Sequence, residues 1–380
     1  MEPEPRQSPV RFYELDALRF VAALSVVCFH YTYRPQAPGN FSPLAFPELD
    51  RVTRYGFLGV ELFFLISGYV VLLSARGKTV RQFLLARVTR LYPAFWTACT
   101  LTFLVLLGWG AGTGAVSMPA GLRADAGRYV YNMTMLHEFL GAWPLDGVYW
   151  SLTVELTFYF LVSLLLAYRL LPHVDWVLAG WLAYTAWVGF GPMTATPFER
   201  LFFPRYAPFF AAGMLFSLLQ PPAGRTWFRY ALLLAAYGLA LHQTFYRAIE
   251  QTSAFHDDVS RKVCLVVVTG CFLLMGGVAF RWLNLSRFSW LTSLGALTYP
   301  LYLLHGNIGF VVFHRLGPST NKYALVGSTL AAMLVASYLL HVWVEQPLRR
   351  SLGRGLAQAV GIYRSRAMPA QRKAEASTAP

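Results

Sequence analysis

Two closely spaced arginines are one candidate for a functional site in this sequence. Arg87 and Arg90 are three residues apart, so they share one face of a helix. Each guanidinium can fork onto phosphate oxygens, and two on one face suit a phosphate-bearing ligand. The same pair could instead anchor the chain to anionic lipid. Pro93 follows closely and tends to break or kink a helix.

A polar stripe near the N-terminus is the second candidate. Asp16 and Arg19 are three apart and can neutralise each other, whereas Arg19 and His30 are eleven apart. Eleven residues make three helical turns plus about 20°, so Arg19 and His30 share a face about 16 Å apart along the axis. His30 could equally be a core histidine bonded to a backbone carbonyl, and spacing alone leaves both interpretations open.

Two carboxylates stand inside apolar runs. Glu61 opens one run, and Glu155 follows Ser151 by one helical turn on the same face. A carboxylate buried in a membrane is costly, so each needs a partner or a purpose. Glu61 could simply pair with a neighbouring arginine, while Ser67 and Gly68 allow close helix packing.

The composition of the whole chain shows where these residues must sit. Of its 380 residues, 56% are hydrophobic and only 13% are charged, and the mean hydropathy is +0.45. This composition excludes a disordered chain, a disulfide scaffold, a coiled coil and an ordinary soluble enzyme, and it predicts a polytopic membrane protein. The net charge of +14 would also fit a nucleic-acid binder. A basic membrane protein, however, collects the same surplus in its cytoplasmic loops.

Ten apolar runs approach the length that a spanning helix needs, at 12–33, 56–75, 91–109, 148–171, 176–191, 205–219, 228–247, 262–280, 291–314 and 323–346. We therefore predict an all-α integral membrane protein with about ten transmembrane helices. An even number puts both termini on one side, and the arginines of 76–90 make that side cytoplasmic. We expect residues 1–350 to form the membrane-embedded domain and 351–380 a basic, disordered cytoplasmic tail.

Four of these segments, in this order and spacing, resemble the acyltransferase-3 family of integral membrane O-acyltransferases. The family begins with an L-D-x-L-R helix that ends in F-H, matched here at 15–19 with 29–30, and continues with a G-V-D-L-F-F-x-x-S-G-F segment, matched at 59–69. Its double arginine before Pro is matched at 87–93, and its W-S-L-x-x-E segment at 150–155. Glu61 stands where the family usually has Asp, and Ala17 replaces a common Gly. Many members carry an additional SGNH hydrolase-like domain, for which this chain has no room, so we expect the standalone form.

The resemblance implies transfer of an acyl group, often acetyl, from cytoplasmic acyl-CoA to a hydroxyl, commonly of a cell-surface glycan. It implies that Arg87 and Arg90, together with Arg19, bind the CoA phosphates. Neutral His30 would then be the general base that deprotonates the acceptor hydroxyl. Direct transfer and a route through an acyl-enzyme both stay open.

The remaining site residues are expected to support this base. Glu155 or Glu61 would orient the imidazole and stabilise its protonated form, as the third member of a catalytic triad does. The acceptor would be contacted by Trp150, Ser151 and His305, the last of which follows Tyr302 by three residues.

The expected partners follow from the same resemblance. They are acyl-CoA, with acetyl-CoA as the expected co-substrate, a glycan or lipid-linked saccharide acceptor, and membrane lipid. No metal and no nucleic acid are expected, and the expected location is the bacterial inner (cytoplasmic) membrane. Buried charges also suit a proton-coupled transporter or flippase without covalent chemistry, or a sensor or scaffold in which they merely pair.

Overall fold

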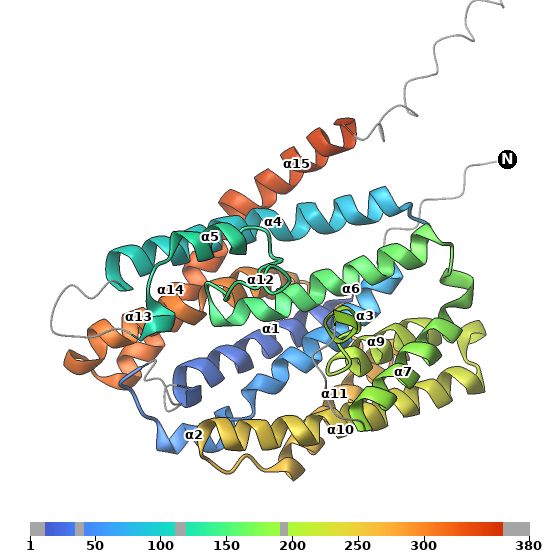
Figure 1. The fold of residues 1–380 in the computed structure, drawn as a ribbon, viewed down its shortest axis with the longest axis horizontal. Helices are drawn as coiled ribbons and strands as arrows, with labels where there is room; N and C mark the ends of the chain where they lie inside the picture. Colours follow the sequence, from blue (N-terminus) through green and yellow to red (C-terminus); the bar gives the residue numbers. More distant parts are fainter. Residues whose placement is uncertain (1–11, 35–41, 111–118, 191–196, 360–380) are drawn as a thin grey trace, which may run out of the picture.

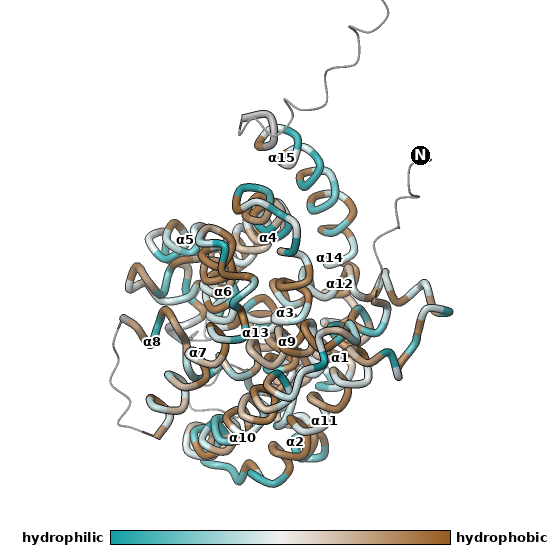
Figure 2. The backbone as a smooth tube through the Cα atoms, turned by 90° about the vertical axis from the view of Figure 1, so that its right-hand side faces the viewer, coloured by the Kyte–Doolittle hydropathy of each residue, from teal (hydrophilic) through white to brown (hydrophobic). Residues whose placement is uncertain are grey.

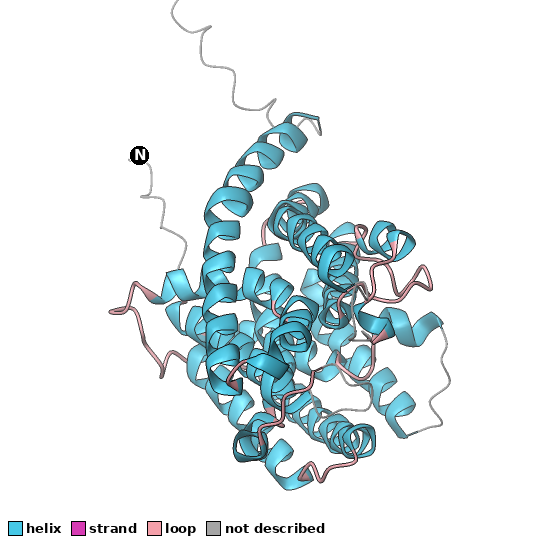
Figure 3. Ribbon diagram, turned by 90° about the vertical axis from the view of Figure 1, so that its left-hand side faces the viewer, coloured by secondary structure: helices cyan, strands magenta, loops and turns pink. Residues whose placement is uncertain are grey.

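The computed structural model describes residues 12–34, 42–110, 119–190 and 197–359, which form a bundle of helices (Figure 1). Across these ranges no strand occurs (Figure 3). Each of the ten predicted runs coincides with a helix: α1 (Tyr13–Cys28), α3 (Gly59–Ala75), α4 (Val80–Val105), α6 (Trp150–Ala167), α7 (Val174–Phe190), α9 (Ala207–Leu219), α10 (Trp227–Phe255), α11 (Arg261–Ala279), α12 (Leu291–Leu304) with α13 (Gly306–Leu316), and α14 (Lys322–Leu340). The other helices are α2 (Pro47–Thr53), α5 (Ala126–Asn132), α8 (Pro197–Phe202) and α15 (Gln346–Ala359).

The prediction of an all-α membrane fold is confirmed. Within the described ranges, seven helices are long and apolar enough to cross a membrane, or eight if the bent pair of α12 and α13 forms one span. The two predicted runs outside this set are α7, which has only 17 residues, and α10, which carries Arg229, Arg247 and Glu250. The count of ten spans and the cytoplasmic side of the termini therefore remain predictions.

Helix α3 forms the centre of the bundle and packs on α1, α6, α9 and α11. It approaches α9 closely because two glycines face each other's helix. A Cβ on Gly68 would lie 2.2 Å from the carbonyl oxygen of Phe210, and one on Gly213 would lie 2.1 Å from that of Leu65. Close helix packing is thus the role of Gly68, as one interpretation of the sequence proposed.

Helix α4 carries the arginine pair and continues through Pro93. It begins with a capping box, in which the Thr79 side chain and Gln82 each bond the other's backbone N–H. Proline removes one backbone hydrogen bond, but the helix on either side of it is maintained by tertiary packing. Of the two expected effects of Pro93, a break or a kink, the break does not occur, and Arg87 and Arg90 lie well inside α4.

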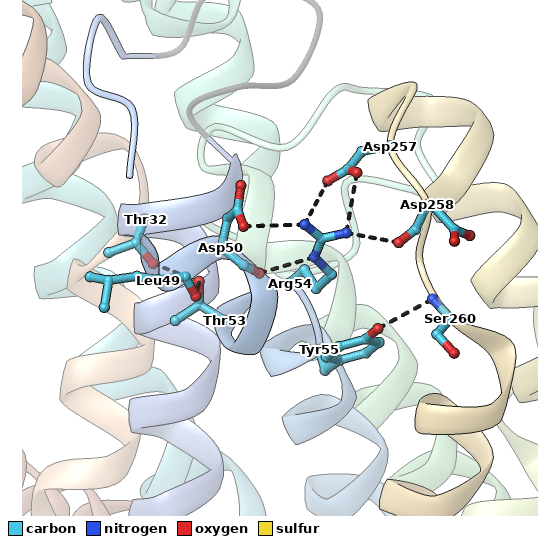
Figure 4. A network of polar contacts seen from close by, with 9 residues as sticks. All are labelled: Thr32, Leu49, Asp50, Thr53, Arg54, Tyr55, Asp257, Asp258 and Ser260. Carbon is cyan, nitrogen blue, oxygen red and sulfur yellow. Dashed lines mark hydrogen bonds and ion pairs between the residues drawn. The ribbon is translucent and has the colours of Figure 1, made fainter. Parts of the chain in front are cut away.

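A polar network fixes the chain that follows α1 (Figure 4). Arg54, just after α2, binds Asp50 at 3.2 Å and Asp257, in the connection from α10 to α11, at 3.1 Å. Thr32, two residues after His30, donates to the hydroxyl of Thr53 at 2.8 Å. Helix α2 is thereby tied both to the α10–α11 connection and to the end of the helix that carries His30.

Helix α15 extends beyond the bundle and is rich in polar residues (Figure 2). Leu348, Leu352 and Leu356 recur every four residues and give it one apolar stripe, and it packs on α4. Residues 351–359, which we expected in a disordered tail, are therefore helical. Residues 360–380 lie outside the described ranges.

Candidate active site

Two histidines from distant parts of the sequence meet inside the bundle. His30 lies in a π-helical turn, Phe29–Tyr33, that ends α1, and His305 lies at the break between α12 and α13. Nδ1 of His30 is 3.3 Å from Nε2 of His305, and their ring centroids are 5.0 Å apart. His305 is fully buried, whereas His30 is partly exposed.

The hydrogen-bond partners of the two rings assign their protons. Nδ1 of His305 lies 2.9 Å and 3.2 Å from the carbonyl oxygens of Tyr302 and Leu301, so it carries the N–H, and its Nε2 is an acceptor. Nδ1 of His30 lies between that acceptor and the carbonyl oxygen of Val26, at 2.8 Å, so it too carries the N–H. The lone pair of neutral His30 is therefore on Nε2, the atom a general base would use.

Neither carboxylate expected to orient His30 does so in this structure. Glu155 accepts hydrogen bonds from Ser67, at 3.3 Å, and from Tyr159. Glu61 forms a buried ion pair with Arg247 at 3.1 Å. Among the described residues, neither glutamate is a hydrogen-bond partner of His30. The reason is geometric, because α3 turns Glu61 toward α10 while the break after α12 brings His305 to His30.

Arg247 was missed at the sequence level. It lies on α10, donates to the Tyr206 hydroxyl at 2.7 Å, and lies 5.6 Å from the ring centroid of Trp150. Trp150 itself packs against the ring of Tyr206, with centroids 5.1 Å apart. A single arginine at the edge of an apolar run was the available signal, because an ionisable residue there requires a partner.

A cavity lies between α1, α3, α4, α6 and α12. Its polar lining consists of Arg19, Ser67, Arg90, Ser151, Glu155, Thr298, Tyr299 and Tyr302. Arg19 also lies 3.9 Å from Asp16, the pairing expected from the sequence. Two guanidiniums and one carboxylate thus line the cavity, and Asp16 offsets part of the charge of Arg19. Guanidinium N–H groups in such a place can donate to an anion.

Arg87 lies outside this cavity lining. Its guanidinium is buried against the rings of Phe83 and Tyr159, at 5.7 Å and 5.6 Å from their centroids. Two of its nitrogens, Nε and Nη1, have no hydrogen-bond partner in the described part of the chain. Tyr159 bonds Glu155, so Arg87 borders the cavity from behind.

Tyr302 connects the cavity to the histidine pair, although neither histidine belongs to the cavity lining. The hydroxyls of Ser151 and Tyr302 share a hydrogen bond of 2.6 Å, and both residues line the cavity. The ring centroid of Tyr302 is 5.7 Å from that of His305. The arginines, the serine and the histidine pair are therefore parts of one connected site. No group of three or more potential metal ligands occurs within the described ranges.

Comparison with known proteins identifies the family. A family model described as an acyltransferase domain, that of the acyltransferase-3 family, matches residues 12–342. The chain is 26% identical to Acyltransferase MdmB of Streptomyces mycarofaciens over 391 positions. This alignment covers 91% of this chain and 93% of that protein. Over 119 positions it is 35% identical to Nodulation protein 10 of Rhizobium leguminosarum bv. viciae, covering 28% of this chain and 32% of that protein. No solved structure gives a significant match.

The family match spans the bundle and includes both histidines and all three arginines of the site. It confirms the interpretation as an enzyme, against a transporter, sensor or scaffold without covalent chemistry. The chain belongs to the acyltransferase-3 family and is an integral membrane acyltransferase.

Proposed function

We propose that this protein transfers an acyl group, acetyl in the first instance, from acyl-CoA to a hydroxyl of a glycan or lipid-linked saccharide. The observation that carries the proposal is the contact of Nδ1 of His30 with Nε2 of His305, which leaves Nε2 of His30 unprotonated. The ring of Tyr302, whose centroid is 5.7 Å from that of His305, links this pair to the arginine-lined cavity. We further propose that the enzyme lies in a bacterial cytoplasmic membrane with both termini on the cytoplasmic side.

The donor site follows from the charges of the cavity. Arg19 and Arg90 bind the phosphates of CoA, and the negative charge of Glu155 in the same cavity reduces the repulsion between the two guanidiniums. Arg87 adds positive charge from behind Tyr159. The pantetheine arm then runs along the cavity toward Tyr302, so that the thioester comes to the histidine pair.

Each step of direct transfer uses a group already in place. Nε2 of His30 takes the proton of the acceptor hydroxyl while its oxygen attacks the thioester carbonyl. The tetrahedral intermediate collapses, the carbon–sulfur bond breaks, and the protonated His30 returns the proton to the CoA thiolate. His305 Nε2 accepts from His30 Nδ1 throughout, which fixes the ring and stabilises its positive charge.

Two hydroxyl groups in the cavity favour a polyhydroxylated acceptor. Ser151 and Tyr302 present hydroxyls beside the histidine pair, and such groups hydrogen-bond a polyhydroxylated acceptor. Trp150 packs on Tyr206 next to Ser151 and supports this end of the cavity from the other side of α6.

Labelled acetyl-CoA tests the proposal. Membrane vesicles containing the full chain are incubated with acetyl-CoA labelled in its acetyl group, and label is counted in the glycan and lipid fractions by mass spectrometry. We expect label esterified to a saccharide in vesicles with the protein and none in matched vesicles without it. Label bound only to protein thiols, or CoA bound without any release of its acetyl group, would contradict the proposal.

A further inference from the structure

The helix that carries His305 is broken at the active site. The axes of α12 and α13 differ by 62°, and His305 occupies the break between them. A break leaves backbone carbonyls unpaired at the end of one helix and backbone N–H groups unpaired at the start of the next. On the carbonyl side, His305 itself supplies the donor, through Nδ1 to Leu301 and Tyr302.

The acceptor on the other side of the break is Asp146. Its side chain is 1% exposed, and its Oδ2 lies 2.7 Å from the backbone nitrogen of Asn307, in the first turn of α13. Its Oδ1 accepts from the backbone nitrogen of Val148 at 3.2 Å, in the turn that leads into α6. One carboxylate therefore joins the start of α13 to the start of α6.

Glycine at position 306 makes this contact possible. A Cβ there would lie 2.2 Å from Oδ1 of Asp146, which is far inside van der Waals contact. The carboxylate thus occupies the space that a side chain would take. Gly306 directly follows His305, so the contact is made at the break itself.

The segment carrying Asp146 is held in turn by two amides. The side chain of Asn307 donates to the carbonyl of Leu145 at 2.8 Å, and the side chain of Asn132 accepts from the Leu145 backbone nitrogen at 2.9 Å. Asn132 is itself fully buried. The carboxylate is therefore anchored on a rigid support, which a positioning group requires.

We propose that Asp146 is a positioning residue of the active site. By accepting the backbone N–H of Asn307 it fixes the bend of the α12–α13 helix, and this bend places the ring of His305 against His30. This inference rests on the proposed function of the histidine pair. It adds which residue holds the ring of His305 in position against His30.

The charge of Asp146 matters to this role. Burial raises its pKa to about 6, while the backbone N–H groups of Asn307 and Val148 and the positive charges of Arg34 and Arg128 oppose that rise. At a pH near 7.5 the group is therefore ionised, and each oxygen accepts one N–H. An asparagine has only one acceptor oxygen, so it cannot satisfy both N–H groups.

Two variants perturb this contact in different ways, and each has a matched control. Asp146→Asn removes one acceptor, and its control is Asp125→Asn, which removes a carboxylate charge in the same segment but keeps the oxygen that caps α5. Gly306→Ala displaces the carboxylate, and its control is Gly147→Ala, where an added Cβ meets nothing within 4 Å. Full-length protein in vesicles is assayed for acetyl-CoA cleavage, and free coenzyme A is used to measure binding.

We expect both contact variants to lower kcat at least about tenfold while the Kd for coenzyme A stays within about twofold of the control variants, since a 1 Å misplacement can cost about 100-fold. A purely structural role would lower kcat and coenzyme A binding together, and that result would overturn the inference. Contact variants with the kcat of their controls would overturn it as well. If Asp146→Asn does not fold, Gly306→Ala decides by the same criteria.

The same assay with His30→Ala separates this inference from the proposed function. An active His30→Ala variant would refute the proposed function whatever Asp146 does. An inactive His30→Ala variant beside fully active Asp146→Asn and Gly306→Ala variants would refute only the positioning role.

Discussion

Nδ1 of His30 lies 3.3 Å from Nε2 of His305 and shares its N–H between that nitrogen and the Val26 carbonyl oxygen, 2.8 Å away, so a second imidazole helps to orient the base of the proposed reaction. A carboxylate in that place would stabilise the imidazolium with a full negative charge. A neutral imidazole gives less stabilisation but costs less to bury in a membrane-embedded bundle.

Replacing His305 with Ala should lower kcat about 100-fold, because His30 loses one of its two Nδ1 acceptors and the ring that packs against it, while the Val26 carbonyl still holds the tautomer. The KM for acetyl-CoA should change little, since the arginine-lined cavity remains. Steady-state kinetics in vesicles measure both quantities. If KM rises and kcat stays constant, His305 contacts substrate instead of orienting His30.

The two arginines of α4 should respond differently. Arg90→Ala removes a guanidinium from the cavity and should weaken binding of free coenzyme A about tenfold or more, because hydrogen bonds to charged groups are worth about 1.5–3 kcal/mol. Arg87→Ala removes a guanidinium packed on Phe83 and Tyr159 and should mainly lower the melting temperature. Equilibrium binding and thermal unfolding separate the two roles. Equal losses of binding in both variants would show that Arg87 contacts the phosphates too.

The buried pair of Glu61 and Arg247 should behave as a structural ion pair. Glu61→Gln leaves Arg247 uncompensated and should destabilise the fold by about 3–5 kcal/mol, while the double variant Glu61→Leu with Arg247→Leu should recover much of that loss. Thermal unfolding of the single and double variants gives the comparison. If Glu61→Gln is stable but has no transferase activity, Glu61 has a catalytic role and is not only part of an ion pair.

His137, in the segment between α5 and α6, should make the fold sensitive to acid. It is fully buried, and neither ring nitrogen has a hydrogen-bond partner in the described structure. Burial lowers its pKa from 6.5 to about 4, so the folded state favours the neutral ring. Its contribution to stability is therefore present above pH 6.5 and is lost as the pH falls toward 4.

The measurement is the difference in melting temperature between about pH 7.5 and pH 5. His137→Leu should show a smaller difference than wild type, whereas the exposed His173→Leu should match wild type. An unchanged pH dependence in His137→Leu would contradict this, because it would show that His137 binds its proton equally in the folded and unfolded states.

The sequence was informative wherever the signal was local. Apolar runs located the ten helices, and the spacing of Asp16 and Arg19 predicted their ion pair. Helical periodicity also placed Ser151 and Glu155 on one face, and both line the cavity.

Contacts between different helices could not be predicted from the sequence. No local pattern shows that α12 breaks at His305, so this residue was assigned to the acceptor rather than to His30. A pairing of Glu61 with an arginine could be expected, but nothing in the sequence identifies Arg247, at the edge of the run 228–247, as that partner. Asp146 has no local signal in the sequence, because its partner Asn307 lies 161 residues away along the chain.

The most direct test of the account is the His30→Ala variant of the full chain, with the exposed His173→Ala as its control. We predict that His30→Ala loses about 100- to 10,000-fold of the transfer rate from acetyl-CoA, while its Kd for coenzyme A and its melting temperature equal those of the control. Transfer at the control rate by His30→Ala would contradict the assignment of His30 as the base.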